Sequence, residues 1–160
     1  MKELKIAAYE SMYHHEYKRL SIEWLEKYNL LEPADLPMLD YPQEEILDKG
    51  GSIFLAHYDK TIVGTISIMR EGKNNFEILK LGVNSDYQGL GIGRKLMAHC
   101  IDICKNKNAD AIILETNTKL LSAITLYKSL GFKEVPLTNF MYQTANYKME
   151  LVLSEWIDSN

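Results

Sequence analysis

Three glycines that alternate with other residues, Gly89, Gly91 and Gly93, form the part of the sequence best suited to bind a ligand, and Arg94 and Lys95 follow them directly. This loop stands between an apolar segment with strand character and an amphipathic helical pattern. A strand-to-helix turn directs free backbone N–H groups outwards at the positive end of the helix dipole. Glycine lets a ligand approach those groups closely. The loop therefore predicts a phosphate-binding site rather than a merely flexible connection.

Two common phosphate-binding motifs do not fit this loop. The NTPase P-loop requires Gly-Lys followed by Ser or Thr, whereas Gly93 is followed by Arg94 and no Ser or Thr follows Lys95. The dinucleotide fingerprint Gly-x-Gly-x-x-Gly belongs to the first strand of a βαβ unit. Here the glycines are two residues apart each time and follow the fourth predicted strand. An ordinary NTPase and a dinucleotide-binding fold are both disfavoured.

Two motifs of the sequence resemble those of one enzyme family. Gln88-x-x-Gly91-x-Gly93 resembles the pyrophosphate loop of the GCN5-related N-acetyltransferase (GNAT) superfamily. The segment AITLYKSLGF, from Ala123 to Phe132, resembles the A-x-x-L-Y-x-x-x-G-F helix of that family. The resemblance implies a single domain over residues 1–160 with an α/β fold. It would be a GNAT-like acyl-CoA N-acyltransferase fold, with helices on both faces of a mixed, splayed central sheet.

The resemblance implies that the chain uses acetyl-CoA as cosubstrate and transfers its acetyl group to a primary amine by direct attack in a ternary complex. The loop amides would bind the pyrophosphate, and the strand edge Leu81-Gly82-Val83 would pair with the pantetheine arm. We expect a strand bulge at Gly82, because glycine inside a strand pattern often marks one. The residues expected at the cofactor are Leu81, Gly82, Val83, Gln88, Gly89, Leu90, Gly91, Gly93, Arg94, Asn117, Ala123 and Tyr127.

Three residues are candidates for the catalytic steps. Tyr127 matches the family's general-acid tyrosine, which would protonate the leaving thiolate. The backbone N–H of Val83 would stabilise the developing oxyanion. Glu77 is the candidate general base, with a chain of water molecules as the alternative. Strand alternation predicts that Glu77, Leu79, Leu81 and Val83 share one face.

The sequence departs from the family pattern at two points. Many relatives carry Asn seven residues before the tyrosine, to bind the cofactor, but this chain has Leu120 there. Asn117, one turn earlier, is the expected substitute. A proline often found before the glycine loop is replaced by the turn Asn84-Ser85-Asp86. Neither change removes a group that the chemistry requires.

The predicted elements can position these residues in an α/β sheet. Helical periodicity predicts helices over residues 11–29, 43–48, 91–104 and 119–130, while the rest of 31–48 contains three prolines and is expected to be irregular. Runs of apolar and β-branched residues predict strands over 4–9, 52–58, 61–69, 76–83, 111–114, 135–136 and 147–153. The order β-α-α-β-β-β-α-β-α-β-β indicates a sheet that begins antiparallel and then contains a β-α-β crossover.

Composition excludes several other classes of protein. The 160 residues are 46% hydrophobic and 25% charged with a net charge of −4, and no basic stripe is present, so a nucleic-acid partner is not expected. No apolar run approaches the length of a membrane span, and the charged N-terminus is unlike a signal peptide, so we expect a cytoplasmic protein. Cys100 and Cys104 are expected to be structural, and no metal-ligand spacing occurs. Dimers are common in the family, so a homodimer is compatible with the resemblance.

The segment from Glu32 to Asp48 contains six acidic residues and neither Lys nor Arg. It is either a solvated loop or an acidic rim that favours a cationic amine. Tyr41 and Tyr142 are further candidates for the same cleft. The expected acceptor is a small-molecule or peptide amine of unknown identity. The main alternative function is a non-catalytic CoA-binding sensor or assembly module, and an enzyme that uses a longer acyl-CoA is a second alternative.

Overall fold

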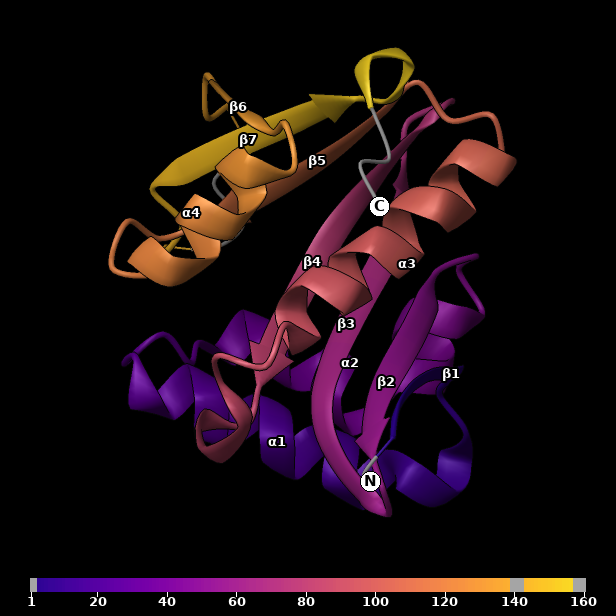
Figure 1. The fold of residues 1–160 in the computed structure, drawn as a ribbon, viewed down its shortest axis with the longest axis vertical. Helices are drawn as coiled ribbons and strands as arrows, with labels where there is room; N and C mark the ends of the chain where they lie inside the picture. The colour runs from indigo at the N-terminus through magenta and orange to yellow at the C-terminus, as the bar shows by residue number, and fades with distance from the viewer. Residues whose placement is uncertain (1–2, 139–142, 157–160) are drawn as a thin grey trace.

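The computed structural model describes residues 3–138 and 143–156, and its seven strands form one sheet in the order β1-β2-β3-β4-β5-β7-β6 (Figure 1). Neighbouring strands are antiparallel except for the parallel pair β4 and β5. The strands are β1 (Leu4–Ala8), β2 (Ser52–Tyr58), β3 (Thr61–Glu71), β4 (Asn75–Val83), β5 (Ala111–Thr116), β6 (Lys133–Val135) and β7 (Tyr147–Val152).

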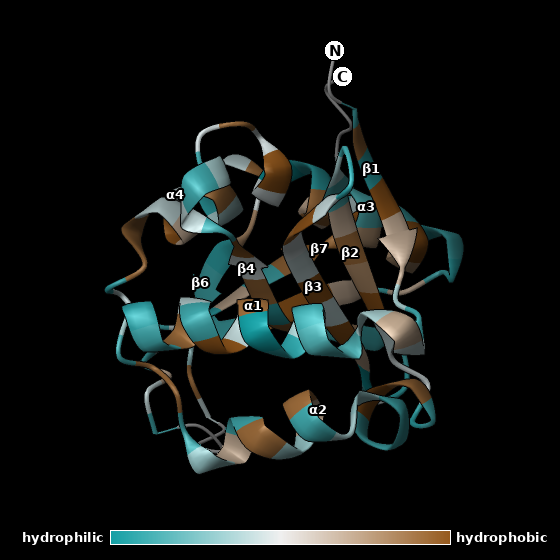
Figure 2. Ribbon diagram, turned by 90° about the horizontal axis from the view of Figure 1, so that it is seen from below, coloured by the Kyte–Doolittle hydropathy of each residue, from teal (hydrophilic) through white to brown (hydrophobic). Residues whose placement is uncertain are grey.

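Helices cover both faces of this sheet (Figure 2). α1 (His14–Lys27) and α2 (Leu36–Asp40) lie on one face, and α3 (Ile92–Asn106) and α4 (Leu121–Ser129) lie on the other. Each layer buries an apolar stripe; in α3, for example, Leu96, Cys100 and Cys104 are fully buried at helical spacing. The sheet therefore has one hydrophobic core on each face, and the predicted fold class is confirmed.

Most predicted elements are present with small differences at their ends, but the segment after α1 is more regular than predicted. It contains α2, where the sequence indicated irregular structure, and a π-helical turn, Gln43–Leu47, where a short helix was predicted. Pro37 lies in the first turn of α2. A proline there loses no helical hydrogen bond, so in this segment it marks the start of a helix rather than a break.

The bulge in β4 lies at Leu79 and not at Gly82, where the sequence placed it. Two consecutive residues of β3 pair with Lys80 and Ile78, so Leu79 is an extra residue in β4. Gly82 is paired regularly with β3. It lies beneath Trp24, whose Cγ would be 3.3 Å from a Cβ at this position. Gly82 therefore provides room for α1 to approach the sheet.

The bulge reverses the alternation of side chains along β4. Glu77, which precedes it, lies opposite Met69 on the face covered by α1 and α2. Leu81 and Val83, which follow it, pack against the core under α3 and α4. The prediction that Glu77, Leu79, Leu81 and Val83 share one face is therefore wrong, because it assumed a strand without an extra residue.

Candidate active site

Strands β4 and β5 separate half-way along β4, immediately before the bulge. Their last paired residues are Ile78 and Leu114. The N–H of Asn84 donates to the carbonyl of Val63 in β3 at 2.8 Å. This bond shows which residues of β4 direct their backbone N–H and C=O groups towards β3. Because successive residues direct their backbone groups to opposite sides of a strand, Leu81 and Val83 point theirs away from β3, towards the gap. The end of β4 is thus a free strand edge.

The glycine loop leads from this edge into α3. Gly91 is the N-cap residue of α3, and Gly89 and Gly91 have φ angles of +81° and +78°. A Cβ at either position would meet no atom within 4 Å, so the space in front of the loop is open. The first N–H groups of α3 have no partner within the helix. Open space, free N–H groups and a helix N-terminus together suit a pyrophosphate.

The free edge and the loop line one groove, which encloses about 1310 Å³ including the part open to solvent. Leu90 is 53% exposed and does not line the groove, and neither does the buried Gly82. The structure brings together eight of the residues predicted at the cofactor: Leu81, Val83, Gln88, Gly89, Gly91, Gly93, Arg94 and Ala123. The exposed guanidinium of Arg94 also donates to Ser129 Oγ at 2.6 Å, which links the groove to α4.

Sequence reasoning missed several residues of the groove. Trp24 lines it from α1 and Tyr28 from the C-cap of that helix. Tyr87 lines it from the turn before the glycines, and Lys119 from the turn before α4. Trp24 and Tyr28 belong to an apolar stripe at helical spacing, a pattern typical of core packing, which consists of Tyr13, Tyr17, Leu20, Trp24 and Tyr28. The ring centroids of Trp24 and Tyr28 are 5.6 Å apart. Nothing in the spacing distinguishes them from Tyr17 of the same stripe, which is fully buried.

A second cavity lies between the separated ends of β4 and β5 and encloses about 710 Å³ including its open part. Glu77, Glu115 and Tyr127 line it, but they do not line the groove. Leu81, Trp24 and Leu120 line both spaces. The groove and the cavity therefore meet at the free edge of β4, so a ligand in one could react with a ligand in the other.

Glu77 is a carboxylate with a pKa suited to proton transfer. Burial, together with repulsion from Glu115 and Glu71, raises the pKa of Glu77 to about 7, although Lys148 and Lys80 act to lower it. A carboxylate with this pKa is present in both protonation states near neutral pH. It can therefore accept a proton there more effectively than an ordinary carboxylate.

Tyr127 lines the same cavity from α4. Its side chain is only 6% exposed, and its ring centroid lies 6.0 Å from that of Phe132. Burial raises the pKa of Tyr127. The hydroxyl therefore remains protonated at neutral pH and is available to donate a proton.

Asn117 lines the cavity rather than the groove, so the structure does not bring it together with the residues of the glycine loop. Its side-chain N–H donates to the carbonyl of Thr144 at 2.6 Å. Its side-chain oxygen accepts from the N–H of Lys119 at 2.9 Å. The first bond joins two loops and the second lies within one turn. The position expected to carry Asn in relatives, Leu120, lies where groove and cavity meet.

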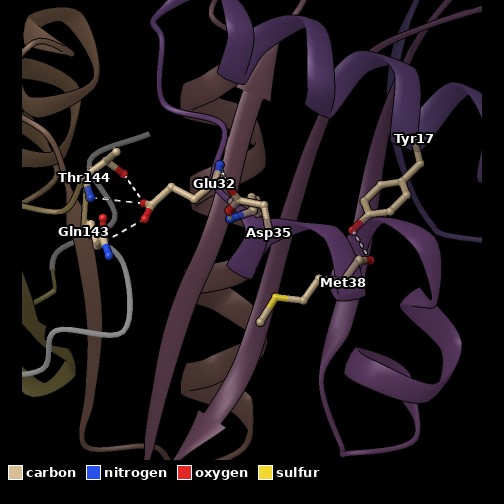
Figure 3. A network of polar contacts seen from close by, with 7 residues as sticks. Tyr17, Glu32, Asp35, Met38, Gln143 and Thr144 are labelled. Carbon is tan, nitrogen blue, oxygen red and sulfur yellow. Dashed lines mark hydrogen bonds and ion pairs between the residues drawn. The ribbon is translucent and has the colours of Figure 1, made fainter.

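The acidic segment after α1 does not form the rim that one interpretation suggested. Asp35 is buried and forms an ion pair with Lys80 at 2.5 Å. Asp40 forms a surface ion pair with Lys18, also at 2.5 Å. Glu32 accepts hydrogen bonds from another loop (Figure 3). Of the six acidic residues, only Asp35 lines the cavity.

Several other expectations concern residues outside the two spaces. Tyr41 is 61% exposed and lines neither of them, and Tyr142 lies outside the described residues. Cys100 and Cys104 are buried and free. Among the residues described, no group of three or more His, Cys, Asp or Glu side chains could hold a metal ion. No helix of that same part of the chain is long and apolar enough to cross a membrane.

Comparison with known proteins gives one consistent result. Residues 9–132 match the model of the acetyltransferase (GNAT) family. A crystal structure of a GNAT-family acetyltransferase from Staphylococcus aureus Mu50 is similar, with a TM-score of 0.84 and 29% identity over 94% of this chain and 99% of that one. The PaiA N-acetyltransferase of Thermoplasma acidophilum, crystallised with coenzyme A, shares the fold at a TM-score of 0.74, with 20% identity over 94% and 99% of the two chains.

The curated relatives match this chain over a smaller part of its length. The N-alpha-acetyltransferase RimI of Mycobacterium tuberculosis is 34% identical over 88 residues, which are 53% of this chain and 54% of that protein. The chain spans about half the length of the curated relatives that it matches.

Proposed function

The chain belongs to the acetyltransferase (GNAT) family, and from this premise we propose that it transfers the acetyl group of acetyl-CoA to a primary amine. The observation that carries the proposal is that the groove and the cavity meet at Leu81, Trp24 and Leu120. A thioester held in the groove would face an amine held in the cavity at this point. The coenzyme A bound to one structural relative and the activity named for RimI support this choice of cosubstrate and acceptor.

The residues of the groove fit acetyl-CoA. The N–H groups from Gly89 to Arg94 would bind the pyrophosphate, since the open space in front of the glycines lets it approach them. The free edge at Leu81 and Val83 would pair with the amides of the pantetheine arm, as an added strand does. Arg94 and Lys119 contribute positive charge near the phosphates. The arm would lead the thioester towards the cavity.

Three groups of the chain then carry out direct transfer. Glu77 accepts a proton from the acceptor ammonium, directly or through water, and the neutral amine nitrogen then attacks the acetyl carbon and loses its second proton to water. The N–H of Val83, which points into the gap, donates to the developing oxyanion. Tyr127 donates its proton to the sulfur as the carbon–sulfur bond breaks, because a thiol of pKa about 8.5 leaves more readily when protonated.

The acceptor is the primary amine of a small molecule or a peptide. Two carboxylates of the cavity, Glu77 and Glu115, favour an acceptor that arrives as an ammonium ion. A CoA-binding sensor or assembly module would need neither a carboxylate with a pKa of about 7 nor a buried tyrosine in a cavity next to the thioester. These two groups favour the enzyme over that alternative.

The test is release of CoA thiol from acetyl-CoA against a panel of primary amines, with the acetylated amine identified by mass spectrometry. Tyr127→Phe should lower kcat by about one to three decades and leave the Kd of CoA nearly unchanged. Tyr13→Phe is the matched control, since Tyr13 lines a surface hollow away from the groove and the cavity. Unchanged turnover in Tyr127→Phe would remove this residue from the mechanism, and tight CoA binding without thiol release would favour the sensor.

A further inference from the structure

The carboxylate of Glu32 holds a loop that is more than a hundred positions away in the sequence (Figure 3). It accepts hydrogen bonds from the backbone N–H groups of Gln143 at 2.8 Å and Thr144 at 3.1 Å. It also accepts one from the hydroxyl of Thr144. Three donors thus converge on one side chain, and the connection joins the segment after α1 to the segment before β7.

This contact belongs to a chain of polar bonds that connects β4 with the end of β5. The N–H of Glu32 donates to Asp35 at 2.8 Å, and Asp35 forms its buried ion pair with Lys80 of β4. On the other side, the carbonyl of Thr144 accepts from Asn117, directly after β5. The chain therefore connects the two strands that separate to form the cavity, and Glu32 is its central member.

The two segments that Glu32 joins are walls of the cavity. Leu30 and Asp35 line it from one segment, and Thr144 and Ala145 line it from the other, whereas Glu32 itself does not line it. The distance between these walls determines how broad an acceptor can be. A bond between these walls would therefore act on an acceptor without contacting it.

We propose that Glu32 is a positioning residue that sets the acceptor specificity of the enzyme, by holding these walls close enough to admit a slender, unbranched primary amine and to exclude a bulky one. This inference rests on the proposed function, because it takes the cavity as the acceptor site. Hydrogen bonds to a charged acceptor are stronger than bonds between neutral groups, so a carboxylate suits this role.

The pKa of Glu32 is shifted in the direction that keeps the side chain charged, and its contact with the loop intact, at neutral pH. Partial burial opposes ionisation, but the hydrogen bonds from Thr144 and Gln143, with a smaller contribution from Lys80, outweigh it and lower the pKa of Glu32. The carboxylate is therefore charged at neutral pH and can accept all three hydrogen bonds.

The experiment measures binding of two conjugates in which CoA is joined through an acetyl linker to n-butylamine or to adamantylmethylamine. The wild type should bind the slender conjugate at least about tenfold more tightly, and Glu32→Ala should reduce this preference to about threefold or less. Glu32→Gln, which keeps one accepting oxygen, should give an intermediate preference and guards against a folding defect in the alanine variant. Glu45→Gln is the matched control, because Glu45 pairs with Lys49 on the surface and does not line the cavity.

The Kd of CoA alone should be the same in all four proteins, which separates a change in specificity from general damage. An unchanged preference in both Glu32 variants would overturn the inference. A wild type without preference, or one that binds neither conjugate better than CoA, would also overturn it. These results do not depend on turnover, so failure of the thiol-release assay alone would contradict the proposed reaction and not the role of Glu32.

Discussion

Glu77 and Tyr127 approach the cavity from opposite faces of the sheet, and burial shifts both pKa values upwards. Removal from water disfavours the charged form of each group. For Glu77 the result is a carboxylate that can accept a proton near neutral pH, and for Tyr127 it is a hydroxyl that keeps its proton. The same burial thus makes Glu77 a stronger base and Tyr127 a weaker acid than either would be in water.

Substitution of Glu77 tests the base directly. Because Glu77 must be ionised to accept a proton, kcat/KM of the wild type should rise with pH through about 7 and then level off. Glu77→Gln should lower kcat/KM by about a hundredfold and remove that limb of the pH profile. An identical profile in the variant would assign the base to a water chain or to Glu115.

Glu77→Gln should lower activity without lowering the stability of the fold. The pKa of Glu77 is raised in the folded protein, so ionisation of Glu77 opposes folding at any pH above its unfolded value of 4.5. Glu77→Gln should therefore be at least as stable as the wild type at pH 8, and the difference should diminish as the pH falls towards 4.5. Urea denaturation at the two pH values measures this, and a large loss of stability at pH 8 would contradict it.

The proposed active site depends on two elements, namely β4 with its bulge and α3 with its glycine N-terminus. Sequence motifs predicted the loop and α4 because the residues of each motif are adjacent in the chain. The bulge was misplaced because Leu79 carries no local signal for it. The bulge lies at the point where β4 still pairs with β3 but no longer pairs with β5. Only the assembled sheet determines this point.

A substitution in the glycine loop tests whether the loop binds the phosphates of CoA. Gly91→Val should weaken CoA binding by more than about tenfold, because valine is strained at a φ of +78° and would fill the open space in front of the loop. Gly72→Val is the matched control, since Gly72 also has a positive φ of +64° and open space around it but does not line the groove. Calorimetric titration with CoA measures both, and normal affinity in Gly91→Val would exclude the loop as the phosphate site.

At the scale of the whole molecule, the two halves of the chain meet around the cavity through polar contacts that no motif reveals. The ion pair between Asp35 and Lys80 joins residues 45 positions apart, and Glu32 reaches a loop more than a hundred positions away. The sequence indicated an acidic segment, but only the fold determines that Glu32 and Asp35 of this segment face partners on other elements. For the same reason Trp24, on α1, could not be recognised as part of the site.

The buried ion pair should contribute much more to stability than a surface pair. Lys80→Met leaves the Asp35 carboxylate buried without this partner and should reduce the free energy of unfolding by about 3–5 kcal/mol. Asp40→Asn, which breaks the exposed pair with Lys18, should cost less than about 1 kcal/mol. Chemical denaturation compares the two, and equal losses would show that burial of the pair has no special weight.

An NMR titration of the labelled protein with CoA tests most directly whether the groove is the cofactor site. If the cofactor lies along the free edge of β4 and over the glycine loop, the largest changes in backbone amide shift should occur at Leu81, Val83 and Gly89 to Arg94. Saturable binding with its largest changes at the surface hollow around Tyr13 and His57, and none at β4, would contradict the assignment of the active site.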